Sequence, residues 1–148
     1  MTTRLSFILI IFLPSYLIGQ SISKNDSSYQ RIIQEECDDR VYTQMEVLPS
    51  VNIKKEAFED TLASYLKAKK FFEKNRSVKY RFVVTTNSHI IDIQKESGNL
   101  ANEIIVKEAI VSFSYLWNPA KQNNHNVCAY VRMEIFFQKE ALKVFISR

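Results

Sequence analysis

The spacing of hydrophobic residues predicts two helices. Between residues 54 and 74, apolar side chains recur mostly three or four positions apart, while charged residues, Glu59 among them, fall on the opposite face. The same spacing returns at residues 100–117, where one stripe holds Ile105, Ala109, Phe113 and Leu116. Asn118 and Pro119 follow and are expected to stop this second helix.

Other segments alternate apolar and polar positions, which is typical of β-strands. Residues 41–47 predict a short strand. Residues 78–84 and 91–93 alternate on either side of a polar turn at residues 87–88, and because asparagine tolerates the left-handed conformation, they predict a β-hairpin. Residues 127–137 predict a long, half-buried strand.

The order strand, helix, hairpin, helix, strand predicts an α+β fold. We expect two helices packed on one face of a small antiparallel sheet of about three strands. The chain has 148 residues, enough for one domain and little more. Its 2 glycines and 3 prolines exclude a flexible or proline-rich spacer. We place this domain at residues 41–148.

The N-terminus has the layout of a secretory signal peptide. Arg4 precedes an apolar run at residues 5–13, and Pro14 breaks the run. Gly19 and Ser23 are small residues after which cleavage would be expected. We therefore expect export.

The predicted signal peptide covers residues 1–19. A spanning helix needs about 20 apolar residues, more than this run supplies, and an uncleaved inner-membrane anchor is the alternative. Residues 20–40 are polar and are expected to form a flexible or loosely structured segment, with a mixed stretch that would fit a short helix.

The distribution of charge and the positions of the two histidines limit the functions that the sequence suggests. The net charge is +4, and its densest basic run, residues 67–70, lies within the first predicted helix, so we expect a solvated helix face and no nucleic-acid partner. His89 lies at the hairpin and His125 in a polar turn, without a Ser-His-Asp or paired-carboxylate setting. A secreted enzyme is therefore a poor candidate, and no cofactor is expected.

Two cysteines, Cys37 and Cys128, would be exposed to an oxidising compartment after export. An even count permits one disulfide, which would close a long loop and stabilise the fold by about 4 kcal/mol. The pairing stays open at this point, because Cys37 lies in an acidic stretch outside the well-patterned region. Neither histidine has a paired spacing with either cysteine, so no metal site is expected.

The segment LWNPAKQNNHNVCAYVRMEIFF, at residues 116–137, resembles the end of the TonB C-terminal domain family. Those domains close with a helix, a Trp-x-Pro-Gly-Lys-Gln-Asn-Gly-type turn and an alternating last strand. Ala120 and Asn124 replace the two glycines, and asparagine can still supply the turn. The matching residues are Trp117, Pro119, Lys121, Gln122 and Asn123.

The resemblance covers roughly residues 41–137. Upstream, the family's hairpin is matched by Phe82, Val83, Val84, Ile90 and Asp92. At the entry to the first helix only Pro49 and the helix residues match, and Ile53 and Lys54 stand where the family has two glycines.

The resemblance implies a non-enzymatic, partner-binding domain of the Gram-negative periplasm. In the family, the last strand offers its edge to a short peptide of an outer-membrane transporter, which adds as a further strand. In this chain that edge would be formed by Val127, Ala129, Tyr130, Val131, Arg132, Met133 and Glu134.

Full transducers of the family carry an inner-membrane helix and a long proline-rich spacer. We find no such spacer, so we expect a stand-alone periplasmic binding module. The alternatives are a membrane-anchored energy transducer that keeps residues 5–18, and an exported inhibitor with a helix-on-sheet fold. An exposed last strand would also allow a homodimer by strand exchange.

Overall fold

The computed structural model describes residues 27–71, 73–138 and 141–147. The predicted signal peptide and residues 20–26 lie outside this range. Within it the helices are α1 (Ser27–Cys37), α2 (Lys55–Ala68), α3 (Glu103–Ser112) and the short 3-10 helix η1 (Ser114–Leu116). The strands are β1 (Ser50–Val51), β2 (Arg76–Val84), β3 (Ile90–Gly98), β4 (Trp117–Asn118), β5 (Ala120–Gln122), β6 (His125–Val127), β7 (Ala129–Phe137) and β8 (Leu142–Ser147).

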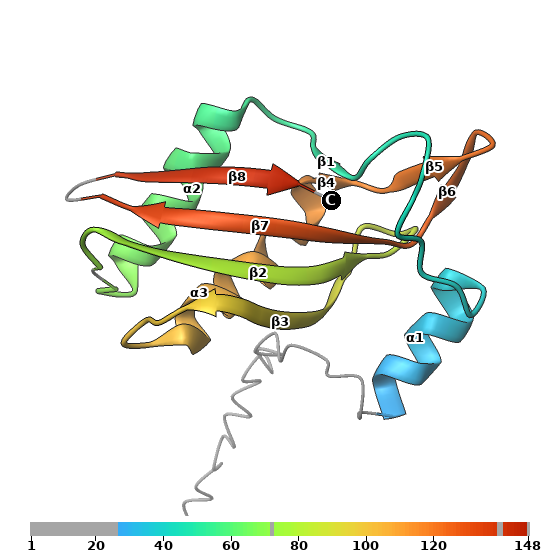
Figure 1. The fold of residues 1–148 in the computed structure, drawn as a ribbon, viewed down its shortest axis with the longest axis horizontal. Coiled ribbons are helices and arrows are strands. Elements are labelled where there is room, and N and C mark those ends of the chain that lie inside the picture. The colour runs from blue at the N-terminus through green and yellow to red at the C-terminus, as the bar shows by residue number, and fades with distance from the viewer. Residues whose placement is uncertain (1–26, 72, 139–140, 148) are drawn as a thin grey trace, which may run out of the picture.

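The main sheet is antiparallel with the order β3-β2-β7-β8. α2 and α3 lie behind one face of this sheet, and α1 lies at one end of the molecule (Figure 1). The short pairs β1-β4 and β5-β6 form two small two-stranded sheets.

Strand alternation divides the buried side chains between the two faces of the sheet. Val78, Tyr80 and Phe82 share a core with residues of α2 and α3, whereas Val83 packs with α1. The buried Trp117 meets the rings of Phe58 and Phe82 edge-on, with centroids 6.3 and 5.3 Å away. These aromatic contacts tie α2, β2 and β4 together.

The α+β class and the predicted hairpin are confirmed. The second helix is shorter than predicted, because the chain tightens into η1 and Trp117 then pairs with Val51 as a strand residue. The predicted strand at residues 41–47 is wrong: this segment makes only isolated bridges, Tyr42 to Ala129 and Val47 to Lys121. Its apolar Met45 instead fills a small cluster with Ala120 and Ala129.

Two further expectations are met only in part. Within the segment expected to be loose, the stretch that would fit a short helix does form one: Ser27–Cys37 is α1, whose Tyr29 and Ile33 are buried against the sheet. The main sheet has four strands rather than three, since Leu142–Ser147 pairs with β7. Buried Leu142 and Val144 extend the same core, which explains why the chain folds back here.

Candidate functional site

The predicted binding edge lies inside the sheet. β7 pairs with β2 along its length and, from Arg132 to Phe137, also with β8. Met133 and Glu134, predicted as edge residues, therefore have strands on both sides, and the prediction of an open edge is wrong there. The physical reason is that the chain returns beside β7 as β8, and the Gln138 N–H donates to the Ala141 carbonyl (2.8 Å).

The earlier part of that predicted edge is also occupied. The Tyr42 N–H donates to the Cys128 carbonyl (2.8 Å), and the Tyr130 N–H donates to the Tyr42 carbonyl (3.1 Å), so the 41–47 segment covers this end of β7. Ala129 and Val131 are buried in the core on either side of Tyr130. Val127 belongs to β6 and pairs with Ala120.

The residues of the TonB-like motif build a hairpin. Lys121 and Gln122 lie in β5, and Pro119 stands between β4 and β5. Asn123 and Asn124 have positive φ values of 50° and 63°, so asparagine does supply the left-handed turn where the family has glycine. Trp117 is a core residue, as described above.

The outer edge of the sheet is formed by β8. The Val144 N–H donates to Oε1 of Glu59 in α2, at 2.8 Å. This N–H therefore points away from β7, and Ile135–Val144 is a non-hydrogen-bonded pair of the ladder. Because strand residues two apart point the same way, the N–H of Ile146 is also directed outward.

Glu59 is a buried carboxylate held by two hydrogen bonds and one further ion pair. It accepts from the Val144 N–H and from the Lys143 ammonium (3.2 Å), and the Lys55 ammonium lies 3.8 Å from its Oε1. Burial alone would raise the pKa of this carboxyl, but the hydrogen bond from Val144 and the two lysines outweigh it and lower the pKa. Glu59 thus stays charged at neutral pH, and its predicted place on the solvated helix face is wrong.

An apolar groove lies beside the C-terminal half of β8. It has a volume of about 340 Å³, and among the described residues that line it Lys55 alone is charged. The Lys55 ammonium lies 4.4 Å from the centre of the Phe145 ring. The lining residues are Val51, Ile53, Lys55, Phe58, Val144, Phe145 and Ile146.

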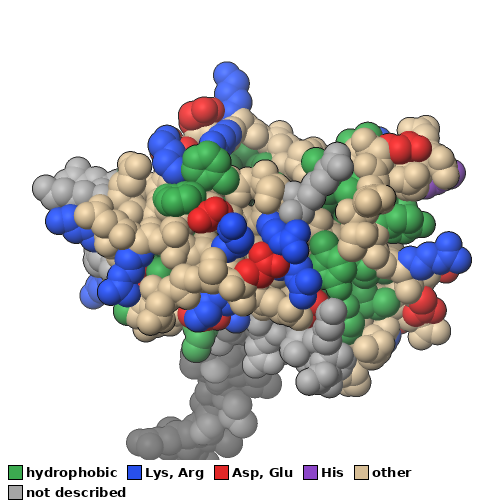
Figure 2. Space-filling view, viewed as in Figure 1, with side chains coloured by type: hydrophobic (Ala, Val, Ile, Leu, Met, Phe, Trp, Pro, Cys, Tyr) green, Lys and Arg blue, Asp and Glu red, His purple; other side chains and the backbone are tan. Residues whose placement is uncertain are grey.

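Exposed hydrophobic side chains adjoin this groove. Phe145 and Ile146 are 53% and 40% exposed, and Phe145 packs edge-on against Phe136 of β7, with ring centroids 5.4 Å apart. Figure 2 shows hydrophobic side chains, bordered by lysine or arginine, over the part of this face where β7 and β8 lie. Such a cluster is suited to contact with another molecule.

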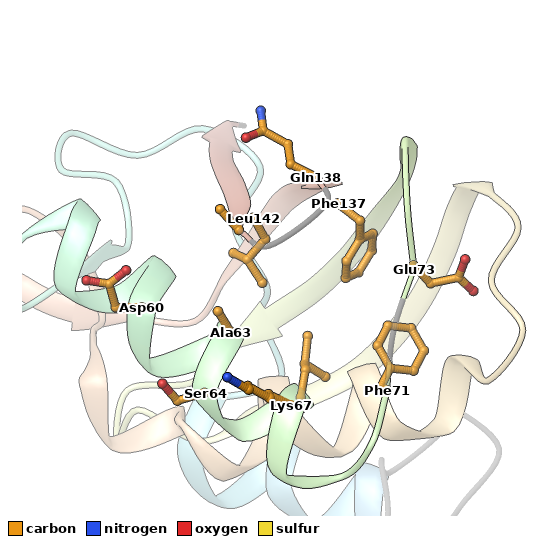
Figure 3. Close-up of a pocket in the computed structure, with 11 residues that line it drawn as sticks. Asp60, Ala63, Ser64, Lys67, Phe71, Glu73, Phe137, Gln138 and Leu142 are labelled. Carbon is orange, nitrogen blue, oxygen red and sulfur yellow. The ribbon is translucent and has the colours of Figure 1, made fainter.

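A second cavity, of about 460 Å³, lies at the opposite end of α2 and β8 (Figure 3). Phe71 and Phe137 lie on one side of it, and α2 with Ala63 and Lys67 on the other. Glu73, at its border, is engaged with the Ala101 N–H (2.7 Å) and with Arg76 (3.6 Å). The lining of this cavity mixes apolar side chains with charged ones.

The opposite edge of the sheet is less suited to pairing. β3 shows two register shifts against β2, opposite Lys79/Tyr80 and Arg81/Val83, and Asp92 within it has a φ of 54°. Bulges of this kind twist an edge and disturb its regular row of donors and acceptors. We therefore take β8 and its groove as the candidate site.

The remaining candidates from the sequence do not line this groove. Cys37 and Cys128 form a disulfide, which answers the question that the sequence left open. Nδ1 of His89 forms a hydrogen bond with Oε1 of Glu36 (2.7 Å), and His125 is exposed in β6. Among residues 27–71, 73–138 and 141–147 there is no group of three or more side chains that could hold a metal ion.

Comparison with protein-family models, curated proteins and solved structures found no match to this chain. In the described part of the chain, no helix combines the length and the hydrophobicity that a membrane crossing requires. The disulfide is compatible with an oxidising, exported location.

Sequence reasoning missed the residues that form this site. Leu142, Val144 and Ile146 alternate with polar or exposed positions, a signal that would have predicted the last strand. The burial of Glu59 had no such signal, because it depends on where β8 meets α2.

Proposed function

We propose that this chain is an exported, non-enzymatic protein-binding module of the TonB C-terminal type. It holds an extended segment of another envelope protein beside β8. The motif at residues 117–124 supports the family, and the disulfide supports an oxidising compartment, which we take to be the periplasm.

The observation that carries the proposal is the groove at the open end of the β8 edge. An extended segment can place an apolar side chain between Val51, Ile53 and Phe145 while its backbone pairs with the outward groups of Ile146. The Val144 N–H already donates to the Glu59 carboxylate and is not available to a partner. We therefore expect the bound segment to be short and to pair with the part of β8 that follows Val144.

The partner that fits this role is a short peptide of an outer-membrane transporter. Backbone pairing supplies affinity, and the apolar groove selects a hydrophobic side chain. The site differs from the one implied by the family, because β8 takes the position beside β7 that a partner strand would otherwise occupy.

A substitution on β8 tests this contact. Proline at Ile146 removes an outward N–H and leaves the pairing of β7 with β8, since an edge strand tolerates proline at such a position. We expect immobilised wild-type protein to retain an envelope protein that Ile146→Pro does not. Ile104→Ser on α3, where Ile104 is 68% exposed, is the matched control and should retain it. Equal retention by all three would refute contact at β8.

Export is tested by the intact mass of the protein in cell fractions from a Gram-negative host. A periplasmic species that starts near Gln20 supports the free module. A full-length species in the membrane fraction would instead favour the anchored transducer.

A further inference from the structure

The edge of β8 offers hydrogen-bonding groups at alternate residues. The ladder with β7 directs the N–H and carbonyl groups of Leu142, Val144 and Ile146 outward. One of these groups, the Val144 N–H, already donates to the carboxylate of Glu59, which lies in helix α2 of the same chain. The carboxylate thus stands where the carbonyl of an added strand would be.

The side chains of β8 also fit a second copy of the same strand. If two β8 strands lie antiparallel with Phe145 on the twofold axis, Val144 of each forms hydrogen bonds with Ile146 of the other. Lys143 then faces Ser147 of the second copy, so that no like charges stand directly opposite each other between the two strands. The two Phe145 rings face each other beside the two Phe136 rings, which covers side chains that are exposed in the single chain.

We propose that the outer edge of β8 is a homodimerisation edge that Glu59 keeps closed. The partner is a second copy of this chain, paired antiparallel through Val144 and Ile146 into a continuous eight-stranded sheet. This inference requires no envelope partner, and a second copy would cover Phe145 and Ile146, the residues proposed above to receive that partner.

Glu59 competes with the second copy for one donor. Its hydrogen bond to the Val144 N–H is charge-assisted and lies within the chain, so it forms without the cost of association. Lys143 and Lys55 hold the carboxylate in place. A dimer with Phe145 on its axis needs both Val144 donors, and it must therefore displace both Glu59 carboxylates.

The test is sedimentation velocity on the full mature chain over a concentration series. Glu59→Ala removes the acceptor, and Glu59→Asp keeps the charge on a side chain one methylene shorter. Both should lower the dimer dissociation constant by about tenfold or more, since each dimer gains two donors. Glu59→Gln keeps an oxygen that can accept from Val144 but loses the charge, so its dissociation constant should fall between those of wild type and Glu59→Ala. Glu56→Ala, at an exposed position of α2, is the matched control and should also behave as wild type.

The interface is identified by adding Ile146→Pro to the Glu59→Ala chain. This removes the Ile146 N–H from both copies and should return the protein to a monomer. Monomers of both Glu59→Ala and Glu59→Asp would overturn the proposal, as would a dimer that survives Ile146→Pro. If Glu59→Ala fails to fold, as judged by near-ultraviolet circular dichroism, Glu59→Asp with and without Ile146→Pro decides.

Discussion

Cys37 and Cys128 join the end of α1 to the residue before β7, across 91 positions of the chain. Without this bond, α1 is held mainly by Tyr29 and Ile33 against Val83 and by the contacts of Glu36. The bond restricts the unfolded chain, because it closes a long loop.

Replacing both cysteines by alanine should lower the free energy of unfolding by about 4 kcal/mol. Urea denaturation of the wild type and of the double variant measures this difference. Reductant should destabilise the wild type and leave the double variant unchanged. A wild type that keeps its stability in reductant would show that the bond contributes little.

Glu59 should make stability depend on pH. Its pKa in the folded protein lies below the ordinary value of 4.5, so the ionised carboxylate stabilises the fold at neutral pH. This contribution is lost as the pH falls from about 4.5 through the folded-state pKa. Urea unfolding between pH 7 and pH 3 should therefore show a larger loss for the wild type than for Glu59→Gln. Parallel curves for the two proteins would contradict the role of the charge.

Trp117 is expected to be the most costly aromatic residue to remove. It is 2% exposed and meets Phe58 and Phe82, so Trp117→Ala should destabilise the fold by about 3–5 kcal/mol. Tyr115→Ala, where the side chain is 66% exposed, should change the stability by less than about 1 kcal/mol. Thermal melts followed by far-ultraviolet circular dichroism compare the two variants. Similar losses of stability would argue against Trp117 as the centre of the core.

Gly98 at the end of β3 is a position where a side chain does not fit. Its φ is +90°, and an added Cβ would clash with the Ser77 carbonyl oxygen and lie 2.8 Å from the Val78 Cα. Gly98→Ala should cost about 2 kcal/mol or more, since strain and a backbone clash add. The exposed neighbour Ser97 provides the control, and Ser97→Ala should melt near the wild-type temperature. Equal melting of both variants would contradict the close approach of β3 to β2.

Patterns in the sequence predicted the elements whose structure depends mainly on their own residues. The hairpin of β2 and β3 and most of α2 followed from alternation and helical spacing. The end of α3 did not, because Phe113 to Trp117 continue the apolar spacing while tertiary pairing of Trp117 with Val51 draws the chain out of the helix.

The candidate site depended on contacts between distant segments. The resemblance ended near Phe137, and the strand beyond it changed β7 from an edge to an internal strand. The burial of Glu59 requires β8 beside α2, across 85 positions from Glu59 to Val144. Spacing along a helix cannot reveal such a contact, and neither can it decide whether Cys37 meets Cys128.

Contact between β8 and an envelope protein can be captured in living cells by site-specific photo-crosslinking, with benzoyl-phenylalanine placed at Phe145 or, as a control, at Ile104 of α3. We predict one envelope protein crosslinked from position 145, absent from position 104 and lost when Ile146→Pro is added. No crosslink from position 145, or the same products from both positions, would contradict the account.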